Sequence, residues 1–154
     1  MPSSIPEIGN PAPLFKTKDD SGKDFDLSLR KGQWTILYFY RKAGTPGCTR
    51  QACAFRDGIA AIRELGGDVF GVSADSVAAL AGFRDRHRLN FALLSDPRSE
   101  VIRLYGCKMP LLGISKGWTF LIDPDLRIRS IEKEVNPVED AFKEASKLRE
   151  FITR

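Results

Sequence analysis

The sequence predicts a single α/β domain over residues 1–154, with a mixed central sheet, helices on both faces and an N-terminal hairpin. Its length suits one domain with a core of its own. Short runs of β-branched and aromatic residues alternate with stretches of helical periodicity, which is typical of helices packed on a mainly parallel sheet. Near the C-terminus two strand-like runs flank a turn without an intervening helix, so the sheet is expected to be mixed.

The first elements are expected to be an extended, proline-rich arm over residues 1–13 and a hairpin. Strand-like residues 15–17 and 24–27 flank a turn-forming cluster, DDSGK, at 19–23. The run TILYFY at 35–40 lacks polar alternation, as expected for a strand covered on both faces. We therefore place this strand in the middle of the sheet.

A long helix is expected from Pro46 to about Leu65, where two glycines end it. Its apolar residues recur at three- and four-residue spacing, so one face is buried. These residues are Phe55, Ile59, Ile62 and Leu65. The alternation continues with a strand at 68–73, a helix at 76–88 carrying Leu80 and Phe83, a strand at 91–94 and a short helix at 99–105.

The C-terminal part is expected to contain an irregular loop at 106–117, strands at 118–122 and 126–132, and a last helix. A cap, a first-turn proline and a reciprocal acid within 136–139 open that helix. The apolar residues expected on its buried face are Val138, Phe142, Ala145, Leu148 and Ile152. Together the elements predict a thioredoxin-like three-layer fold.

The chemistry is expected where the central strand gives way to the long helix, in the segment Thr45-Pro-Gly-Cys48. Threonine is a good N-cap and proline fits the first helical position, which places Cys48 at the third. Unpaired N–H groups and the positive end of the helix dipole favour a thiolate there, and such sites lower a cysteine pKa from about 8.5 to roughly 3.5–7.5. Arg41, Lys42 and Arg50 act in the same direction. The alternative is that Cys48 is a small buried apolar residue.

The motif TPGCT at 45–49, followed by Cys53 and then FRD, resembles the peroxiredoxins. Within them it is similar to the bacterioferritin comigratory protein group, also called peroxiredoxin Q. Three further blocks resemble the family, so the likeness covers nearly the whole chain. They are GNPAPLF at 9–15, LLSD at 93–96 and WTFLIDP at 118–124.

The resemblance implies a thiol peroxidase that needs no metal, haem or flavin. Cys48 attacks a hydroperoxide and becomes a sulfenic acid, Cys53 condenses with it to a disulfide, and a thioredoxin or similar dithiol reduces that disulfide. In the family, the threonine at the position of Thr45 hydrogen-bonds the thiolate or the peroxide; its alternative role is the helix cap alone. The resemblance also suggests a monomer.

The spacing of the two cysteines has a mechanical consequence. Five residues along a helix separate two Cα atoms by about 8.6 Å, whereas a disulfide needs about 4.4–6.8 Å. The first turns of the helix must therefore unwind for the bond to form. Gly47 favours that, as does the lack of any long-range tie visible in the sequence. The alternative is that Cys53 is a core residue and the helix never opens.

Two positions depart from the family pattern. A proline usually stands where this chain has Arg41, and an arginine usually stands where it has Gly117. Lys116 or Arg41 is expected to supply the missing charge, although lysine cannot donate the paired hydrogen bonds of a guanidinium. We expect loss of Lys116 to slow the peroxidase and an arginine at position 117 to accelerate it. Alternatively, Arg41 is an ordinary surface charge and the peroxidase is weakened.

Three other residues are expected to have structural roles. Cys107 lies in the irregular loop and matches no family motif. His87, the one histidine, is expected to be a favourable charge at a helix C-terminus, and Trp118 is expected in the core. One histidine and three cysteines at these spacings do not make a zinc site.

Composition and charge bear on partners and location. The chain has 24 basic and 20 acidic residues, a net charge of +4 and a pI near 9.1, but no basic run. A mixed, solvated surface is therefore favoured over nucleic-acid binding. No apolar run approaches the roughly 20 residues needed to span a membrane, and the N-terminus lacks the pattern of a secretory signal, so we expect a cytoplasmic protein.

Two other functions stay open. A peroxide-responsive redox sensor with little turnover on the same fold is favoured by the two departures at positions 41 and 117. A general disulfide oxidoreductase is disfavoured, because four residues separate the cysteines rather than the two of a Cys-x-x-Cys motif.

Overall fold

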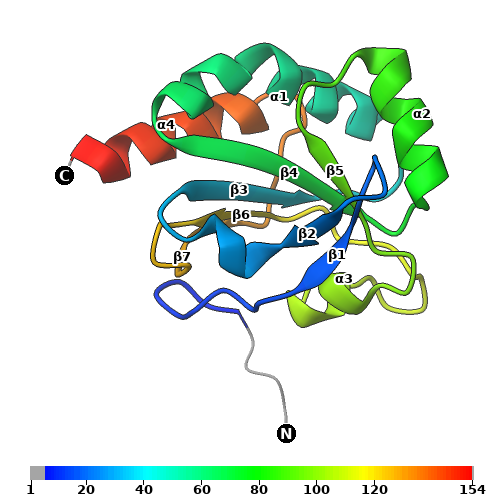
Figure 1. Cartoon of the computed structure of the whole chain (residues 1–154), viewed down its shortest axis with the longest axis horizontal. Coiled ribbons are helices and arrows are strands. Elements are labelled where there is room, and N and C mark those ends of the chain that lie inside the picture. Colours follow the sequence, from blue (N-terminus) through cyan, green and yellow to red (C-terminus); the bar gives the residue numbers. More distant parts are fainter. Residues whose placement is uncertain (1–5, 154) are drawn as a thin grey trace, which may run out of the picture.

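The computed structural model describes residues 6–153, and within that range a seven-stranded sheet carries helices on both faces (Figure 1). The strands are β1 (Lys16–Asp19), β2 (Asp24–Asp26), β3 (Trp34–Phe39), β4 (Gly67–Ser73), β5 (Ala92–Ser95), β6 (Thr119–Ile122) and β7 (Ile128–Glu132). The helices are α1 (Pro46–Glu64), α2 (Val77–His87), α3 (Glu100–Leu104) and α4 (Asp140–Thr153), with a 3₁₀ helix, η1 (Leu27–Arg30). The strand order is β2-β1-β5-β4-β3-β6-β7, in which β5, β4 and β3 are parallel and the other neighbours antiparallel.

Strand β3 lies inside the sheet because it is apolar on both faces. On one face Ile36 and Tyr38 pack into a core with residues of α1, α2 and α4. On the other face Leu37 and Phe39 pack into a second core with residues of α3 and the N-terminal hairpin. Figure 1 shows α1, α2 and α4 above the sheet and α3 below it. The predicted thioredoxin-like fold with a mixed sheet is therefore confirmed.

The described part of the N-terminal arm is held against the opposite end of the chain. The backbone N–H of Gly9 donates to the carbonyl of Ile128 at 2.7 Å, and that of Ala12 donates to the carbonyl of Leu126 at 2.8 Å. The arm therefore runs beside the start of β7 as a bonded segment. Residues 1–5 of the predicted arm lie outside the described residues.

The buried face of α4 differs from the prediction. Asn136 caps the turn before the helix, since its side chain accepts from the N–H groups of Val138 at 3.0 Å and Glu139 at 3.3 Å. Three residues expected in the core are exposed instead, namely Val138 at 61%, Phe142 at 76% and Ile152 at 41%. The residues that are buried are Asp140, Ala141, Glu144, Ala145 and Leu148.

Two buried acids explain this difference. Glu144 accepts a hydrogen bond from Lys147 Nζ at 3.0 Å, and Asp140 accepts from the side chains of Gln51 and Thr119. When the buried face of a helix is predicted from the spacing of its apolar residues, acidic residues are assigned to the solvent-facing side, because unpaired charges are rarely buried. Here the acids have partners, so their side of the helix turns inward; Ala145 and Leu148 stay buried as predicted, while Val138, Phe142 and Ile152 turn outward.

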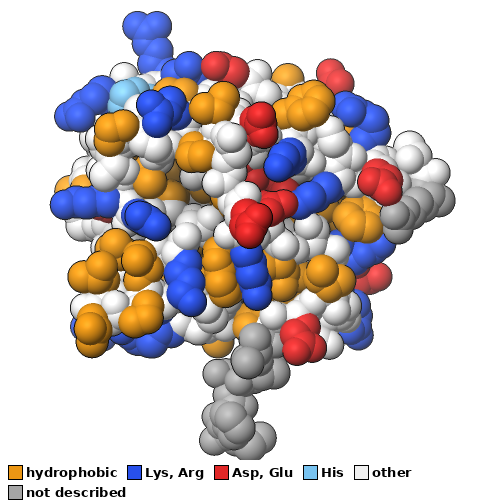
Figure 2. All heavy atoms as spheres, turned by 180° about the vertical axis from the view of Figure 1, so that it is seen from behind, with side chains coloured by type: hydrophobic (Ala, Val, Ile, Leu, Met, Phe, Trp, Pro, Cys, Tyr) orange, Lys and Arg blue, Asp and Glu red, His pale blue; other side chains and the backbone are white. Residues whose placement is uncertain are grey.

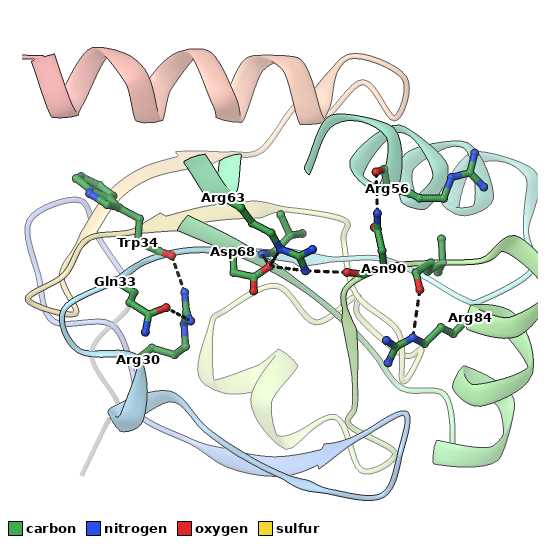
Figure 3. Close-up of polar contacts among 10 residues, drawn as sticks. Arg30, Gln33, Trp34, Arg56, Arg63, Asp68, Arg84 and Asn90 are labelled. Carbon is green, nitrogen blue, oxygen red and sulfur yellow. Dashed lines mark hydrogen bonds and ion pairs between the residues drawn. The ribbon is translucent and has the colours of Figure 1, made fainter. Parts of the chain in front are cut away.

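The second half of α1 is tied to the loop between α2 and β5 (Figure 3). Arg56 Nη1 donates to the carbonyl of His87 at 2.6 Å, and Asn90 Nδ2 donates to the carbonyl of Arg56 at 3.2 Å. Arg63 Nη2 donates to the carbonyl of Asn90 at 2.7 Å. These bonds hold residues 56–63 against the body of the domain. His87 lies in the last turn of α2, where the sequence places it.

The surface carries mixed charge. On the face seen in Figure 2, Lys and Arg side chains are interspersed with Asp and Glu. The predicted irregular loop at 106–117 contains one isolated bridge, between Lys108 and Ser115, and exposes Leu111 and Leu112. Within residues 6–153, no helix combines the length and the apolar character needed to cross a membrane.

Candidate active site

Cys48 lies in the first turn of the helix that follows β3. Thr45 stands at the N-cap position, Pro46 is the first helical residue and Cys48 is the third, as predicted. Cys48 and Cys53 are both half-buried, and neither forms a disulfide. Helix α1 is continuous through both cysteines, so the structure represents the reduced protein with its first turns wound.

A cavity of about 390 Å³ opens beside Cys48. It brings together four of the five predicted site residues, Arg41, Thr45 and Cys48 from the segment that opens α1 and Lys116 from the loop before β6. Cys53 is not among its lining residues. The complete lining consists of Tyr40, Arg41, Thr45, Gly47, Cys48, Gln51, Lys116, Gly117, Val135 and Pro137. Cys48 is thus a half-buried pocket residue, not the fully buried apolar residue of the alternative interpretation.

The Thr45 side chain does not cap the helix, so that prediction is wrong. Its hydroxyl donates to the carbonyl of Lys42 at 2.8 Å and makes no bond to the first-turn N–H groups. The backbone of Thr45 still begins the helix, because its carbonyl accepts from Thr49 N–H at 2.9 Å. The hydroxyl proton is therefore engaged, and the lone pairs of Oγ1 remain available to accept a bond from a ligand in the cavity.

Two cations reach the cavity without a charged partner. Among residues 6–153, neither Arg41 nor Lys116 lies within ion-pair distance of a carboxylate. Lys116 Nζ lies 5.3 Å from the centre of the Trp118 ring, and Lys133 Nζ lies 4.6 Å from the same ring. Trp118 is half-buried rather than fully inside the core, and its ring helps to place Lys116 at the cavity.

Gly117 occupies its position for a conformational reason. Its φ angle is +82°, a left-handed conformation that residues with a side chain rarely adopt. The family pattern has an arginine at this position, and we expected that residue to accelerate the enzyme. That effect on rate stays a prediction, and the backbone adds a conformational cost, because an arginine here would have to adopt a φ that residues with a side chain rarely take.

We predict that Gly117→Arg lowers the free energy of unfolding by about 1–2 kcal/mol, the cost of a left-handed conformation for a residue with a Cβ. Urea unfolding of the purified variant measures this effect. Gly82→Ala is the matched control, because Gly82 lies in α2 with nothing within 4 Å of an added Cβ and is expected to become more stable by up to about 1 kcal/mol. Unchanged stability in Gly117→Arg would contradict the conformational argument.

Cys107 is separate from the cavity and fully buried. Its sulfur accepts from Ser115 Oγ at 3.7 Å, and its thiol donates to the carbonyl of Ile102 at 3.6 Å. Burial raises the pKa of this thiol to about 12, so it stays protonated and unreactive. The expected structural role of Cys107 is confirmed by its burial.

A buried polar cluster that the sequence analysis missed lies next to the cavity. Gln51 lines the cavity and donates through Nε2 to Asp140 Oδ2 at 3.0 Å, and Thr119 Oγ1 donates to the same oxygen at 2.7 Å. Burial raises the pKa of Asp140, with the two hydrogen bonds acting against that shift. Burial and the nearby Asp140 raise the pKa of Glu144 to about 7. In the sequence Asp140 and Glu144 look like ordinary helix acids, so no sequence signal points to this cluster.

A thioredoxin-like domain with a cysteine on the first turn of the helix after its central strand, and a second cysteine five residues on, is a thiol-based redox protein. The AhpC/TSA family model matches residues 8–131. The chloroplastic peroxiredoxin Q of Triticum aestivum is 41% identical over 116 residues, which cover 75% of this chain and 54% of that protein. The putative peroxiredoxin bcp of Coxiella burnetii is 38% identical over 135 residues, covering 84% and 89%.

A solved structure is also similar over almost its full length. Peroxidoxin BcpB from Mycobacterium tuberculosis matches with a TM-score of 0.88 and 33% identity, over 94% of this chain and 97% of that chain. The chain therefore belongs to the AhpC/TSA family, and within it to the peroxiredoxin Q and bcp group. The resemblance found in the sequence is confirmed. The chain spans about half the length of the wheat relative, at 54%.

Proposed function

We propose that this chain reduces hydrogen peroxide and organic hydroperoxides, with Cys48 as the attacking thiol, Cys53 as the resolving thiol and a thioredoxin-like dithiol as the reductant. The observation that carries the proposal is the cavity in which Thr45, Arg41 and Lys116 surround Cys48. Its volume of about 390 Å³ lies within the range of small-molecule sites and leaves room for an organic group. The enzyme is proposed to act as a monomer in the cytoplasm, without metal or nucleic acid.

In the first step the Cys48 thiolate attacks one oxygen of the peroxide, and the O–O bond breaks. Cys48 becomes a sulfenic acid, and the leaving oxygen takes up a proton to form an alcohol or, from hydrogen peroxide, water. Thr45 Oγ1 accepts a hydrogen bond from the peroxide hydroxyl, since its own proton is engaged by Lys42. This contact orients the peroxide over the sulfur.

Positive charge at the cavity stabilises the transition state. Negative charge develops on the leaving oxygen as the O–O bond breaks, and cations held in a partly enclosed site stabilise it without having to reorganise. Lys116 and Arg41 line the cavity and are proposed to share this role. Lys116 has the more fixed position of the two because its ammonium group lies against the Trp118 ring.

In the second step the Cys53 thiol condenses with the sulfenic acid of Cys48, forming a disulfide and releasing water. The two residues lie five positions apart on a continuous α1, too far for the bond, so the first turns of the helix unwind. A dithiol reductant then attacks the disulfide, returns both cysteines to thiols and is itself oxidised to a disulfide.

The test of this proposal is turnover of hydrogen peroxide and of an alkyl hydroperoxide with a thioredoxin, its reductase and NADPH. Sustained, peroxide-dependent oxidation of NADPH supports the peroxidase. A single oxidation of Cys48 without further turnover would favour a peroxide-responsive sensor instead. Gly117, which leaves the family's arginine position without a side chain, is the observation that keeps this second function in consideration.

We predict that Lys116→Ala lowers kcat/KM for peroxide at least tenfold, about 1.4 kcal/mol of barrier, because it removes a cation from the cavity. Lys133→Ala is the matched control: it removes the other lysine from the same Trp118 ring but no lining residue of the cavity. Its rate is expected to stay within about twofold of the unsubstituted enzyme, since Lys133 does not line the cavity and its exposed charge is screened by salt. Equal effects in the two variants would contradict a specific role for Lys116.

A further inference from the structure

The segment of α1 between the two cysteines is held by one buried polar side chain, Gln51, beside the buried apolar Ala52. Gln51 stands three residues after Cys48 and two before Cys53, and its Nε2 donates to Asp140 Oδ2 on α4 at 3.0 Å. Thr119 on β6 donates to the same carboxylate oxygen at 2.7 Å. Gln51, Asp140 and Thr119 are 5%, 1% and 0% exposed, so this contact is shielded from competing water.

The two halves of α1 are anchored differently. Among the residues that the structure describes, Gln51–Asp140 is the one hydrogen bond that a side chain of residues 46–55 makes outside its own helix. From Arg56 onward, Arg56, Arg63 and Asn90 connect the helix to the loop after α2 (Figure 3). The first half of α1 can therefore unwind while the second half stays bound, once this polar contact is released and Ala52 leaves its buried position.

We propose that the Gln51–Asp140 bond is a latch that keeps the first turns of α1 wound and sets the rate at which Cys53 reaches oxidised Cys48. The inference rests on the proposed function, since it concerns the second step of that reaction. Bringing the cysteines within disulfide distance unwinds residues 48–53, which include Gln51. The bond to Asp140 must then break, and the buried carboxylate keeps Thr119 as its donor.

The Gln51–Asp140 bond also explains why the first turns of α1 are wound in the resting protein. Asp140 Oδ1 has no hydrogen-bond partner, so the carboxylate depends on the two donors that reach Oδ2. Loss of Gln51 leaves a buried acceptor with half of its donors, which favours the wound helix. Gln51 is thus a positioning residue. It keeps Cys48 at the helix N-terminus while peroxide reacts, and its bond to Asp140 breaks once the sulfenic acid has formed.

The first test compares Gln51→Leu with Thr119→Val. Each protein is mixed with one equivalent of hydrogen peroxide, quenched at intervals and analysed by mass spectrometry for the Cys48 sulfenic acid, trapped with dimedone, and for the Cys48–Cys53 disulfide. Gln51→Leu is expected to convert the sulfenic acid to the disulfide about tenfold faster, because the helix opens without breaking the bond. Thr119→Val is not expected to accelerate it, because it leaves Asp140 dependent on Gln51 alone.

Comparing these two variants distinguishes a specific effect of the Gln51–Asp140 bond on α1 from a general loss of stability. Both variants remove a donor from Asp140, so both are expected to unfold at lower urea concentration. If the cluster were merely structural, both would accelerate disulfide formation to a similar extent. Amide hydrogen exchange of the reduced proteins gives a second readout that needs no peroxide: in Gln51→Leu it is expected to increase over residues 47–55 and not over residues 56–64.

The second test replaces the donor of the latch with a second acid. Gln51→Glu places a second carboxylate against Asp140, and two buried carboxylates remain together only while they share a proton. Disulfide formation in this variant is therefore expected to accelerate as pH rises, beyond any change in the unsubstituted protein. The charged and titratable groups that act on Asp140 from the surrounding elements are Glu144 and Lys147 on α4, Glu132 on β7 and Tyr38 on β3.

The double variant Gln51→Glu/Asp140→Asn restores a donor–acceptor pair with reversed polarity. The amide nitrogen introduced at position 140 donates to the carboxylate introduced at position 51. The amide oxygen at position 140 still accepts from Thr119. We expect the rate and the pH profile of disulfide formation to return to those of the unsubstituted protein. Such rescue does not follow from loss of packing.

The outcomes distinguish the latch from the proposed function. If the unsubstituted protein forms the Cys48–Cys53 disulfide, but Gln51→Leu changes neither its rate nor the exchange of residues 47–55, the latch is overturned and the peroxidase stands. If peroxide yields no such disulfide in any variant, the resolving step of the proposed function fails. A role of the latch in catalysis fails with it, whatever the exchange data show.

Discussion

We expect Cys48→Ser to lower peroxide consumption at least about a thousandfold, a loss of roughly 4 kcal/mol of transition-state stabilisation. A serine hydroxyl is a weak nucleophile at neutral pH without an adjacent base, and it cannot form a sulfenic acid. Serine is close to cysteine in size, so the half-buried first turn of α1 is expected to keep its structure. Initial rates of peroxide loss, with the thioredoxin system in excess, measure the effect.

Cys107→Ala is the control for this prediction. The Cys107 thiol is buried, lies outside the cavity and has a pKa raised to about 12, so its removal is expected to leave peroxide consumption within about twofold. Robust activity in Cys48→Ser, or loss of activity in Cys107→Ala, would show that the nucleophile has been assigned to the wrong residue.

The sequence predicts the site best where the signal is local. The strand over 35–40, the break after it and the Thr-Pro-Gly-Cys segment are contiguous, and each depends on backbone preferences of its own residues. The structure accordingly places Cys48 at the third position of α1, and Phe55, Ile59 and Ile62 in the core. Helix boundaries elsewhere differ by one to a few residues, where caps and turns compete.

Features that depend on distant partners were predicted less well. The sequence shows Asp140 and Glu144 as ordinary helix acids, and only the fold shows that Gln51, Thr119 and Lys147 reach them. The same contacts rotate the buried face of α4 away from the face that its apolar residues predict. They also connect α1 to α4, a long-range contact that is not visible in the sequence. A buried acid cannot be recognised without its partners, because its burial is tolerated only when they are present.

Two local features depend on backbone conformation that the residue type alone does not reveal. Thr45 has the right identity for a capping side chain, but its hydroxyl turns back to Lys42 and closes the turn that precedes the helix. The sequence shows Gly117 only as a position where the family has an arginine, whereas the structure shows a left-handed backbone that favours glycine there. In both cases the residue type was compatible with several geometries, and the surrounding chain selected one.

The second large effect is expected in Cys53→Ser. Cys53 does not line the cavity, so the first reaction with peroxide is expected to proceed at close to the unsubstituted rate. The sulfenic acid then has no thiol within the chain to condense with, since Cys107 is buried and protonated. Turnover with the thioredoxin system is therefore expected to fall at least about a hundredfold, roughly 2.7 kcal/mol of barrier.

Two measurements check this prediction. Single-turnover peroxide loss is compared with steady-state NADPH oxidation, and the oxidised protein is treated with dimedone and mapped by mass spectrometry. The adduct is expected on Cys48 in Cys53→Ser, whereas the unsubstituted protein is expected to yield a Cys48–Cys53 disulfide within one chain. Ala54→Ser, which adds a hydroxyl to the neighbouring position of α1 and keeps both cysteines, is expected to turn over normally.

Two results would reject the assignment of Cys53. Undiminished turnover in Cys53→Ser would mean that the external reductant attacks the sulfenic acid directly, so α1 has no need to unwind. A disulfide from Cys48 to Cys107, or between two chains, would mean that the resolving thiol lies elsewhere. The first result leaves the peroxidase intact and removes the reason for a latch at Gln51, because the helix would then complete its catalytic cycle without breaking the bond to Asp140.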